Sequence, residues 1–590
     1  MCRHGFVGVA CLFAAFGNAQ VIPVFLQQSL SSAAISGSGS SIVFCSSYAN
    51  SNYVADVFSV NVDGSNLRQL TKLSTGTTGV ALSSDGHWAS FTAGQSGINE
   101  EVHLLNVTAD SDSILTVDKQ GCVLPLAICV GCVYTCLRTP HVTDDGSAIL
   151  YAAERSQPFY VVKNDGSSPA NLPVYSGNLA ASPKRVIARN GQVVFSSNSL
   201  TSPTQASPGQ VYLMNLDGTN IRAVTQLSGE SVYPLDATIS ADGSEIAFTV
   251  SSASGTTIYT VRADGSQMNA VASGHVSSPS LSADGSLLTY VDTGQAVLLA
   301  LSVPSAGSKK LTNLQYSRVN DATISDDGTR VAFTIGPQNG GNGAIYSIGS
   351  NATNQQAAYA PRTINPSGVQ GAVAGSLVSI YGTNFIGDAL ITAGALPLPK
   401  TLGGVSAEIN GAAAPLLGVS SWQINAQIPP DVPPSTTTTF DAAFSDGSHT
   451  AAIQANVAFV FPTVYFLASD AFTGAQAAVF HGNTAIAADP AHPATTGEAL
   501  VLYASGLGPT NPTVPAGVAP PANPPATTAI TPQVSVGGKP ALLLFSGLAP
   551  GFVGVYQINF LLPAGLPAGT QSISITSAGQ SGGSGVISVQ

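Results

Sequence analysis

The sequence predicts an all-β fold in which a seven-bladed β-propeller is followed by two immunoglobulin-like β-sandwich modules. A phrase of two short strands joined by a tight turn recurs seven times in the first 360 residues. Gly and Pro number 61 and 37 while charged residues make up 8%, which favours many short strands and turns over long charged helices. After residue 361 a different order of strands occurs twice.

The recurring phrase is clearest at Thr238 to Phe248, which reads T-I-S-A-D-G-S-E-I-A-F. Its aromatic position is filled along the chain by Phe44, Phe91, Tyr151, Phe195, Phe248, Tyr290 and Phe333. These positions are 42 to 60 residues apart, a spacing that suits four-stranded propeller blades. We therefore expect one blade for each aromatic residue.

Two tight turns punctuate each repeat. Asp-Gly closes the first pair of strands, and a second Asp-Gly precedes the last strand, as at Asp63, Asp165, Asp217 and Asp264. Asp tolerates positive φ and Gly has no Cβ, so both pairs favour hairpins. Within the second strand, an aliphatic residue lies two positions before the aromatic one, as in Ile246 and Phe248. Both then point to one face of the sheet, which predicts a packing role.

Residues 1–19 contain Arg3, a short apolar run and the small residues Gly17 and Ala19, which is typical of a cleavable secretory signal peptide. The chain is expected to be secreted, periplasmic or on the cell surface, without membrane insertion after cleavage. With 19 basic and 31 acidic residues the net charge is -12, so nucleic acid is not an expected partner.

Residues 30–360 resemble the TolB-type propeller repeats, which are WD40-like and carry the phrase W-S-P-D-G-x-x-I-A-F followed by I-Y-V-M-x-x-D-G. Here S-L-S-A-D-G (280–285) and I-Y-T-V (258–261) match that pattern, with Trp and Pro replaced. The resemblance implies a propeller and, as one possible role, envelope assembly.

Residues 361–590 resemble the C-terminal domain of large secreted acidobacterial proteins. G-S-L-V-S-I-Y-G-T-N-F (375–385) is similar to the start of an IPT/TIG domain, and W-Q-I-N-A-Q-I-P (422–429) returns as Y-Q-I-N-F-L-L-P (556–563). We expect a first module over 361–460 and a second over 461–590. The resemblance implies export and an accessory module.

Four cysteines, Cys122, Cys129, Cys132 and Cys136, cluster in the longest interval between repeats. In an exported protein two local disulfides are expected, with three possible pairings; a zinc site and a redox pair are alternatives. Cys45 is then a buried free thiol. No metal site is assigned to the chain.

Asp236 and Asp321 occupy the same repeat position, at the start of D-A-T-I-S. First strands line a propeller's channel, so these carboxylates, with Arg318 and His275 nearby in the repeat, are candidates for binding a ligand or Ca²⁺. G-Q-S-G-G (579–583) has the letters of a nucleophile elbow, but no His, Asp or Glu follows it. No catalytic residue is assigned.

These observations favour an exported, non-enzymatic binding or scaffold protein whose propeller face binds an extracellular or envelope protein or polysaccharide. No cofactor is expected beyond a possible Ca²⁺. One alternative is a propeller enzyme acting on extracellular glycan or peptide, which needs convergent His, Asp, Glu or Arg side chains. Another is an envelope-assembly factor of the TolB type.

Overall fold

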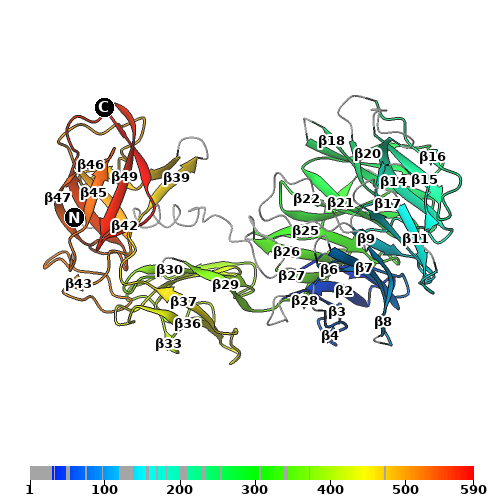
Figure 1. The fold of residues 1–590 in the computed structure, drawn as a ribbon, viewed down its shortest axis with the longest axis horizontal. Coiled ribbons are helices and arrows are strands. Elements are labelled where there is room, and N and C mark those ends of the chain that lie inside the picture. Colours follow the sequence, from blue (N-terminus) through cyan, green and yellow to red (C-terminus); the bar gives the residue numbers. More distant parts are fainter. Residues whose placement is uncertain are drawn as a thin grey trace. The chain divides into compact units, whose positions relative to one another are not determined.

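The computed structural model describes residues 30–590 apart from 32, 48–53, 74–75, 96–97, 110, 119–136, 154–158, 168–169, 175, 181–182, 200–208, 229–232, 253–254, 304–306, 316, 338–342, 371 and 471–473. All elements named in these residues are β-strands, β1 to β51, which confirms the all-β prediction (Figure 1). The chain divides into two compact units, residues 26–361 and residues 362–590. In the described part, no helix has the length and apolarity needed to span a membrane.

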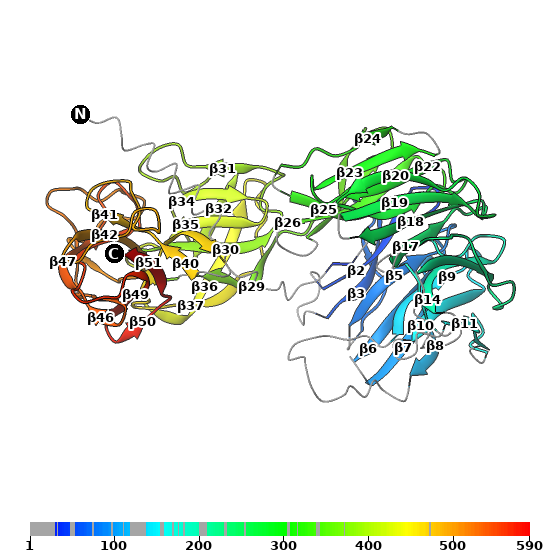
Figure 2. The same cartoon turned by 90° about the horizontal axis from the view of Figure 1, so that it is seen from above.

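The first unit consists of antiparallel sheets that each contain four consecutive strands, and the described residues form seven of them (Figure 2). This number equals the number of aromatic positions. The first strands of the sheets are β1 (Ala34–Ile35), β5 (Thr77–Leu82), β9 (Leu137–Val142), β13 (Ser176–Asn178), β17 (Tyr233–Ile239), β21 (Val276–Leu281) and β25 (Ser317–Ile324). The second strands are β2 (Ser41–Ser46), β6 (Trp88–Gln95), β10 (Ala148–Ala153), β14 (Gln192–Ser199), β18 (Glu245–Ser252), β22 (Leu287–Asp292) and β26 (Arg330–Pro337).

The third and fourth strands form the outer half of each sheet. The third strands are β3 (Asp56–Asn61), β7 (Ile98–Asn106), β11 (Phe159–Lys163), β15 (Gln210–Asn215), β19 (Gly255–Arg262), β23 (Val297–Ser302) and β27 (Ala344–Gly349). The fourth strands are β4 (Arg68–Gln69), β8 (Ser111–Asp118), β12 (Ala170–Asn171), β16 (Arg222–Ala223), β20 (Asn269–Gly274), β24 (Ser308–Lys310) and β28 (Gln356–Tyr359). Sheets built from successive strands in this way are those of a β-propeller.

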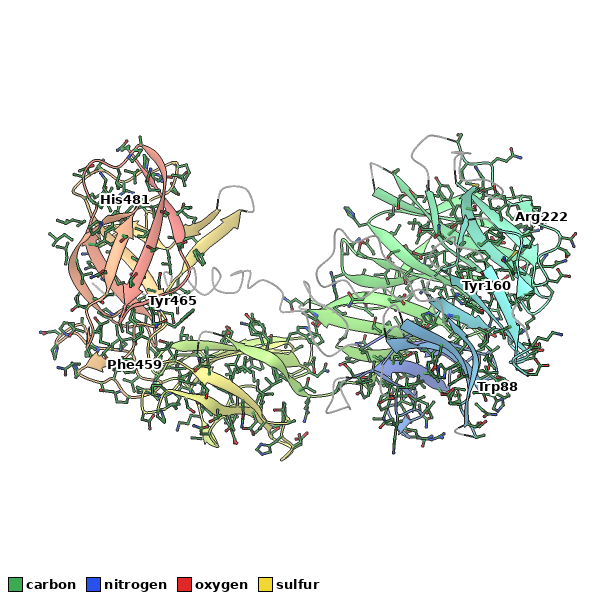
Figure 3. All side chains as sticks on the ribbon, viewed as in Figure 1. Trp88, Tyr160, Arg222, Phe459, Tyr465 and His481 are labelled. Carbon is green, nitrogen blue, oxygen red and sulfur yellow. The ribbon has the colours of Figure 1, made fainter. Side chains whose placement is uncertain are left out.

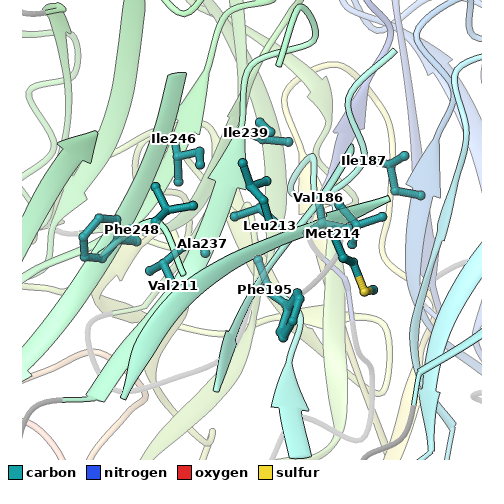
Figure 4. Close-up of a cluster of buried hydrophobic side chains, with 14 of the residues drawn as sticks. Val186, Ile187, Phe195, Val211, Leu213, Met214, Ala237, Ile239, Ile246 and Phe248 are labelled. Carbon is teal, nitrogen blue, oxygen red and sulfur yellow. The ribbon is translucent and has the colours of Figure 1, made fainter. Parts of the chain in front are cut away.

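The repeated aromatic residues lie on the second strands and are buried, with at most 4% of any of them exposed. Most stack on a ring of the third strand; Phe248, for example, lies 5.6 Å from Tyr259 between ring centroids. Hydrophobic clusters then join neighbouring sheets, as where Phe195 and Leu213 meet Ile239 and Ile246 (Figure 4). The predicted packing role of these residues is confirmed.

The first and last sheets meet through side chains and close the ring. Their shared core contains Phe44 and Phe58 from the first sheet and Ile345 and Tyr359 from the last. The rings of Phe44 and Tyr359 lie 4.7 Å apart, and the hydroxyls of Ser46 and Tyr359 are 3.3 Å apart. No sheet of the described residues mixes strands from both ends of the unit, so packing rather than shared strand pairing closes it.

The second unit contains two pairs of sheets, each pair around its own core. The first pair consists of β29 (Thr363–Gln370), β30 (Leu377–Thr383), β35 (Gln423–Gln427), β34 (Leu416–Ser420) and β31 (Leu390–Thr392) in one sheet, and β33 (Ala412–Ala413), β32 (Val405–Ile409), β36 (Ser435–Phe444) and β37 (Ile453–Val457) in the other. Both sheets contribute to one hydrophobic cluster, for example through Ile380 and Phe440.

The second pair repeats this plan with more strands. One sheet runs β38 (Thr463–Val464), β42 (Ala499–Ser505), β48 (Tyr556–Leu561), β47 (Leu542–Leu548), β44 (Thr527–Thr528) and β43 (Thr510–Asn511), with β41 (Val479–His481) beside β42. The other runs β39 (Phe466–Asp470), β40 (Gly474–Ala477), β51 (Gly585–Val589), β49 (Gly569–Ser577), β45 (Gln533–Val536) and β46 (Lys539–Pro540), with β50 (Gln580–Ser581) beside β49. Ile558 and Ile573 belong to its shared core.

The two Q-I-N motifs have the same role in both pairs. Ile424 and Ile558 are buried, whereas the flanking Gln and Asn point away from the core. On β35 the amide of Gln423 donates to Asn425 at 2.7 Å, and on β48 that of Gln557 donates to Asn559 at 2.9 Å. The repeated letters therefore correspond to one repeated strand with one side-chain bond.

Candidate functional site

The turns between the first and second strands bring seven equivalent residues to one end of the propeller channel. In the turns that contain an aspartate, its side chain is occupied locally: Asp145 accepts hydrogen bonds from the hydroxyl of Thr143 and the N–H of Ser147. These bonds lower the pKa of Asp145 and hold the turn. The residue before the turn aspartate (Ser in the first repeat and Asn in the fourth) is left to face the channel. Along the chain this position holds Gly37, Ser84, Asp144, Arg189, Ala241, Ala283 and Asp326.

Four side chains cross this end of the channel as an ionic lattice, which we call the channel lattice: Asp144, Arg185, Arg189 and Asp326. Arg185 contacts Asp144 at 2.8 Å and Asp326 at 2.7 Å. Arg189 contacts the other oxygens of the same two carboxylates, at 3.0 and 2.8 Å. The planar, forked guanidinium group is suited to such paired contacts. Ser84 adds a hydroxyl that donates to Asp326.

The ion pairs of the channel lattice stabilise the charged forms of its side chains. The side chains of Asp144, Arg185 and Asp326 are each about one fifth exposed or less, whereas Arg189 is 53% exposed. Burial opposes the charged form of Arg185, but Asp326 and Asp144 outweigh it and raise the pKa of the guanidinium. Both oxygens of each carboxylate are engaged by arginine. These carboxylates are consequently suited to fixing geometry, and not to accepting a proton in a reaction.

Above the lattice the channel opens into a hollow of about 540 Å³, which we call the mouth hollow. It is lined by Gly37, Ser38, Ser84, Asp85, Asp144, Arg189, Ala283, Asp326 and Asp327. None of these described residues is aromatic. The lining includes four carboxylates, from Asp85, Asp144, Asp326 and Asp327. Only two guanidinium groups oppose them, those of Arg189 in the lining and of Arg185 beneath it. The mouth hollow therefore has an excess of negative charge.

A second polar layer lies deeper in the channel, around Lys184. This lysine is 5% exposed; its Nζ lies 2.8 Å from Asp321 and also donates to the carbonyl oxygen of Ala322. The hydroxyl of Ser278 donates to Asp321. Burial raises the pKa of Asp236, Lys184 opposes that rise and Asp321 adds to it. A cavity of about 60 Å³ lies between the two layers and has room for only a few water molecules.

The structure brings two of the four predicted site residues together. Asp236 lies in the bulge of β17, Asp321 borders the bulge of β25, and both interact with Lys184. Arg318 is half-buried earlier on β25, and His275 is exposed beside β21, where its carbonyl accepts the N–H of Thr293. The described contacts do not join His275 to the Asp236 and Asp321 pair.

Sequence reasoning missed Lys184, Arg185 and the whole channel lattice. The signal was present as the doubled aspartates of T-D-D-G (143–146) and S-D-D-G (325–328), where the other repeats have Gly, Ser, Arg or Ala before the turn. The basic partners come from the one repeat whose turn reads Asn-Gly, after P-K-R (183–185). The P-K-R segment lies between β13 and the isolated bridge that pairs Ile187 with Val193. Its first residue, Pro183, has no N–H to donate to a neighbouring strand.

Other predictions have mixed outcomes. Cys45 is a buried free thiol, as expected, and burial raises its pKa to about 12. Cys122, Cys129, Cys132 and Cys136 lie outside the described residues, as do residues 1–19, so the disulfides and the signal peptide stay predictions. His103 packs on Phe91 and binds Asp112, and His141 is buried; both have packing roles in the propeller.

Comparison with known proteins supports the propeller. Residues 209–378 match the model of the lipoprotein LpqB β-propeller domain. No curated protein matches the chain significantly.

Several solved structures are similar to the chain. One is the β-propeller domain of the Trilobed protease from Pyrococcus furiosus, with 10% identity and a TM-score of 0.40, over 56% of this chain and 97% of that one. Another is oligogalacturonate lyase from Vibrio parahaemolyticus, with 14% identity and a TM-score of 0.38, over 55% and 89%. A third is TolB from Acinetobacter baumannii, with 13% identity and a TM-score of 0.32, over 60% and 70%. Similarity this low does not bear on what this chain binds.

Proposed function

We propose that this chain is an exported binding protein that holds a basic segment of a partner protein in the mouth hollow of a seven-bladed propeller. In this proposal residues 361–460 and 461–590 form two immunoglobulin-like accessory modules. The partner is an extracellular or envelope protein. Fold by itself does not assign a function, so the proposal rests on the site.

The observation that carries the proposal is the fixed polar lining of the mouth hollow. Its two lattice carboxylates are paired on both oxygens, which favours recognition over proton transfer. The hollow is open to solvent and of a size that suits one or two side chains of a ligand.

The negative charge of the mouth hollow and of the whole chain favours one class of partner. Asp85 and Asp327 add negative charge to a lattice whose own charges cancel, and the full chain has a net charge of -12. Both features attract cationic groups and favour encounter with basic partners. A glycan is disfavoured because the described lining residues offer no aromatic ring for a sugar to stack on.

The test is a binding measurement with a blocking variant. Purified protein is applied to arrays of lysine-rich, neutral and acidic peptides and of polysaccharides. We expect saturable binding to the lysine-rich peptides, and its loss in Ala283→Trp, which fills the mouth hollow and replaces none of the four lattice side chains. Ala223→Trp, the same change at an exposed site on β16 at the outer edge of its sheet, is the matched control and should bind like the unmodified protein.

Three results would contradict the proposal. Binding that survives Ala283→Trp places the ligand elsewhere. Saturable binding of polysaccharides without peptide binding supports a glycan receptor, and conversion of an arrayed molecule supports an enzyme. Circular dichroism of both tryptophan variants excludes a simple loss of folding.

A further inference from the structure

Three metal-ligating side chains meet on the outer face of the first sandwich, far in sequence from the propeller channel. Glu408 on β32 lies directly opposite Asp441 on β36, and the neighbours Ala407, Ile409, Phe440 and Ala442 point into the core. His449 follows the turn after β36, and its Nδ1 lies 3.1 Å from a carboxylate oxygen of Asp441. One ligand atom from each of the three residues lies within 4.8 Å of the other two.

The position of these acids is unfavourable unless a cation is nearby. Like charges placed directly opposite each other on paired strands destabilise a sheet. Even a protonated His449 leaves an excess of negative charge, and among the described residues neither carboxylate forms an ion pair with Lys or Arg. Arg362 pairs instead with Asp446, at 2.5 Å, and its guanidinium lies over the ring of Phe444.

The second sandwich shows that the fold does not require acids here. Its strands β45 and β49 correspond to β32 and β36, because each first strand leads through a glycine turn into a two-residue partner strand. At the corresponding pair of positions Ser535 lies opposite Ser574. Two uncharged residues thus satisfy the same architecture, and the Glu408, Asp441 and His449 group is an addition specific to the first sandwich.

We propose that Glu408, Asp441 and His449 bind a divalent transition metal ion, with Zn²⁺ the best match. Two carboxylates and an imidazole are a ligand set that Zn²⁺ accepts, and three protein ligands leave a fourth position for water or for an atom of a partner. Ca²⁺ prefers oxygen ligands alone, so the histidine argues against it. Asp441 is 15% exposed and His449 49% exposed, so the ion can enter from solvent.

Isothermal titration calorimetry of the full chain with ZnCl₂ tests this proposal. Iodoacetamide is added first to alkylate any accessible free thiol, so that thiolates do not compete for Zn²⁺. We expect saturable binding at micromolar Zn²⁺, weakened at least about tenfold by Glu408→Gln and by His449→Ala, since even outer-shell changes cost 10–100-fold. Bound Zn²⁺ should also raise the melting temperature of the second unit in the unmodified protein and not in these variants.

His492→Ala is the matched control, because His492 also lies beside a carboxylate, at 3.2 Å from Asp489, but the described residues place no third ligand atom with this pair. It should bind Zn²⁺ like the unmodified protein. The proposal is overturned by an absence of saturable binding, by equal affinity in all variants, or by tighter binding of Ca²⁺ that His449→Ala leaves unchanged. Circular dichroism confirms that each variant is folded.

Discussion

At the scale of single residues, the role of a polar side chain in this propeller depends on its position in the repeat. The turn aspartates are all satisfied within four residues of themselves, as Asp284 is by Ser282 and Ser286. The residue just before them instead meets partners from other sheets, as Asp144 meets Arg185 across 41 residues of sequence. The first kind of aspartate stabilises a turn and the second builds a site.

His141 provides a test at this scale. It is fully buried beneath the channel lattice, where its Nε2 lies 3.0 Å from the carbonyl oxygen of Ala180, and burial lowers its pKa to about 4. Between pH 6.5 and about 4 the unfolded chain binds this proton and the folded chain does not, so stability falls as the pH falls. The loss attributable to His141 is about 3 kcal/mol across that window.

Replacing His141 by Gln should therefore cost more at pH 7 than at pH 4.5, with a difference of roughly 2 kcal/mol in the free energy of unfolding. Urea denaturation of the variant and the unmodified protein at both pH values measures it. His275→Gln, at an exposed histidine, is the control for the substitution itself. An equal cost at both pH values would show that His141 becomes protonated in the folded protein.

At the scale of elements, the hairpin is the unit that the chain copies. Its glycines adopt positive φ, which only glycine does at little cost. Two of them differ in their surroundings. A Cβ on Gly146 (φ +70°) would lie 2.3 Å from the ring of Trp88 on the neighbouring sheet, whereas a Cβ on Gly191 (φ +78°) would meet nothing within 4 Å. Trp88 is the first residue of β6 and is labelled in Figure 3.

Gly191→Ala should cost about 1 kcal/mol of propeller stability, because a left-handed conformation is strained for alanine. Gly146→Ala should cost more by roughly 1–3 kcal/mol, because the methyl group also displaces Trp88. Chemical denaturation of both variants gives the comparison, and Trp88→Ala combined with Gly146→Ala should recover part of the difference. Equal costs for the two glycines would mean that the indole moves away freely.

At the scale of the whole molecule, closure of the ring is the feature that no single repeat contains. Tyr359 of the last sheet lies against Phe44 and Phe58 of the first, and Thr323 donates to the carbonyl oxygen of Ala33 across the same joint. Since these contacts are packing and side-chain bonds, we expect the joint between the first and last sheets to open more readily than the sheets themselves.

Tyr359→Ala should lower the stability of the propeller by about 3–5 kcal/mol, the usual cost of deleting a buried aromatic ring. Hydrogen exchange should rise chiefly in β2, β3, β26 and β27. Tyr359→Phe loses only the contact with Ser46 and should cost about 1 kcal/mol or less. Tyr160→Ala, which removes a ring that stacks on Tyr151 within one sheet, is the control and should loosen β10 and β11 instead. Uniform loosening in both variants would show that the joint is no weaker than the sheets.

The sequence by itself determined the local structure of this protein. Asp-Gly turns, the alternation that buries Phe248 with Ile246, and the repeated Q-I-N strands are set by residues close together in the chain, because turn geometry and two-residue periodicity are local properties. The all-β class, the aromatic packing and the buried thiol of Cys45 could therefore be predicted.

Only the tertiary structure decided which side chains meet. Lys184, Arg185 and Arg189 come from one atypical repeat, while their partners Asp144, Asp321 and Asp326 lie 41 to 141 residues away. Likewise, Glu408 and Asp441 become neighbours through strand pairing in the first sandwich. Such contacts depend on how sheets are arranged about the channel and on strand register, and a turn or a strand pattern carries no information on either.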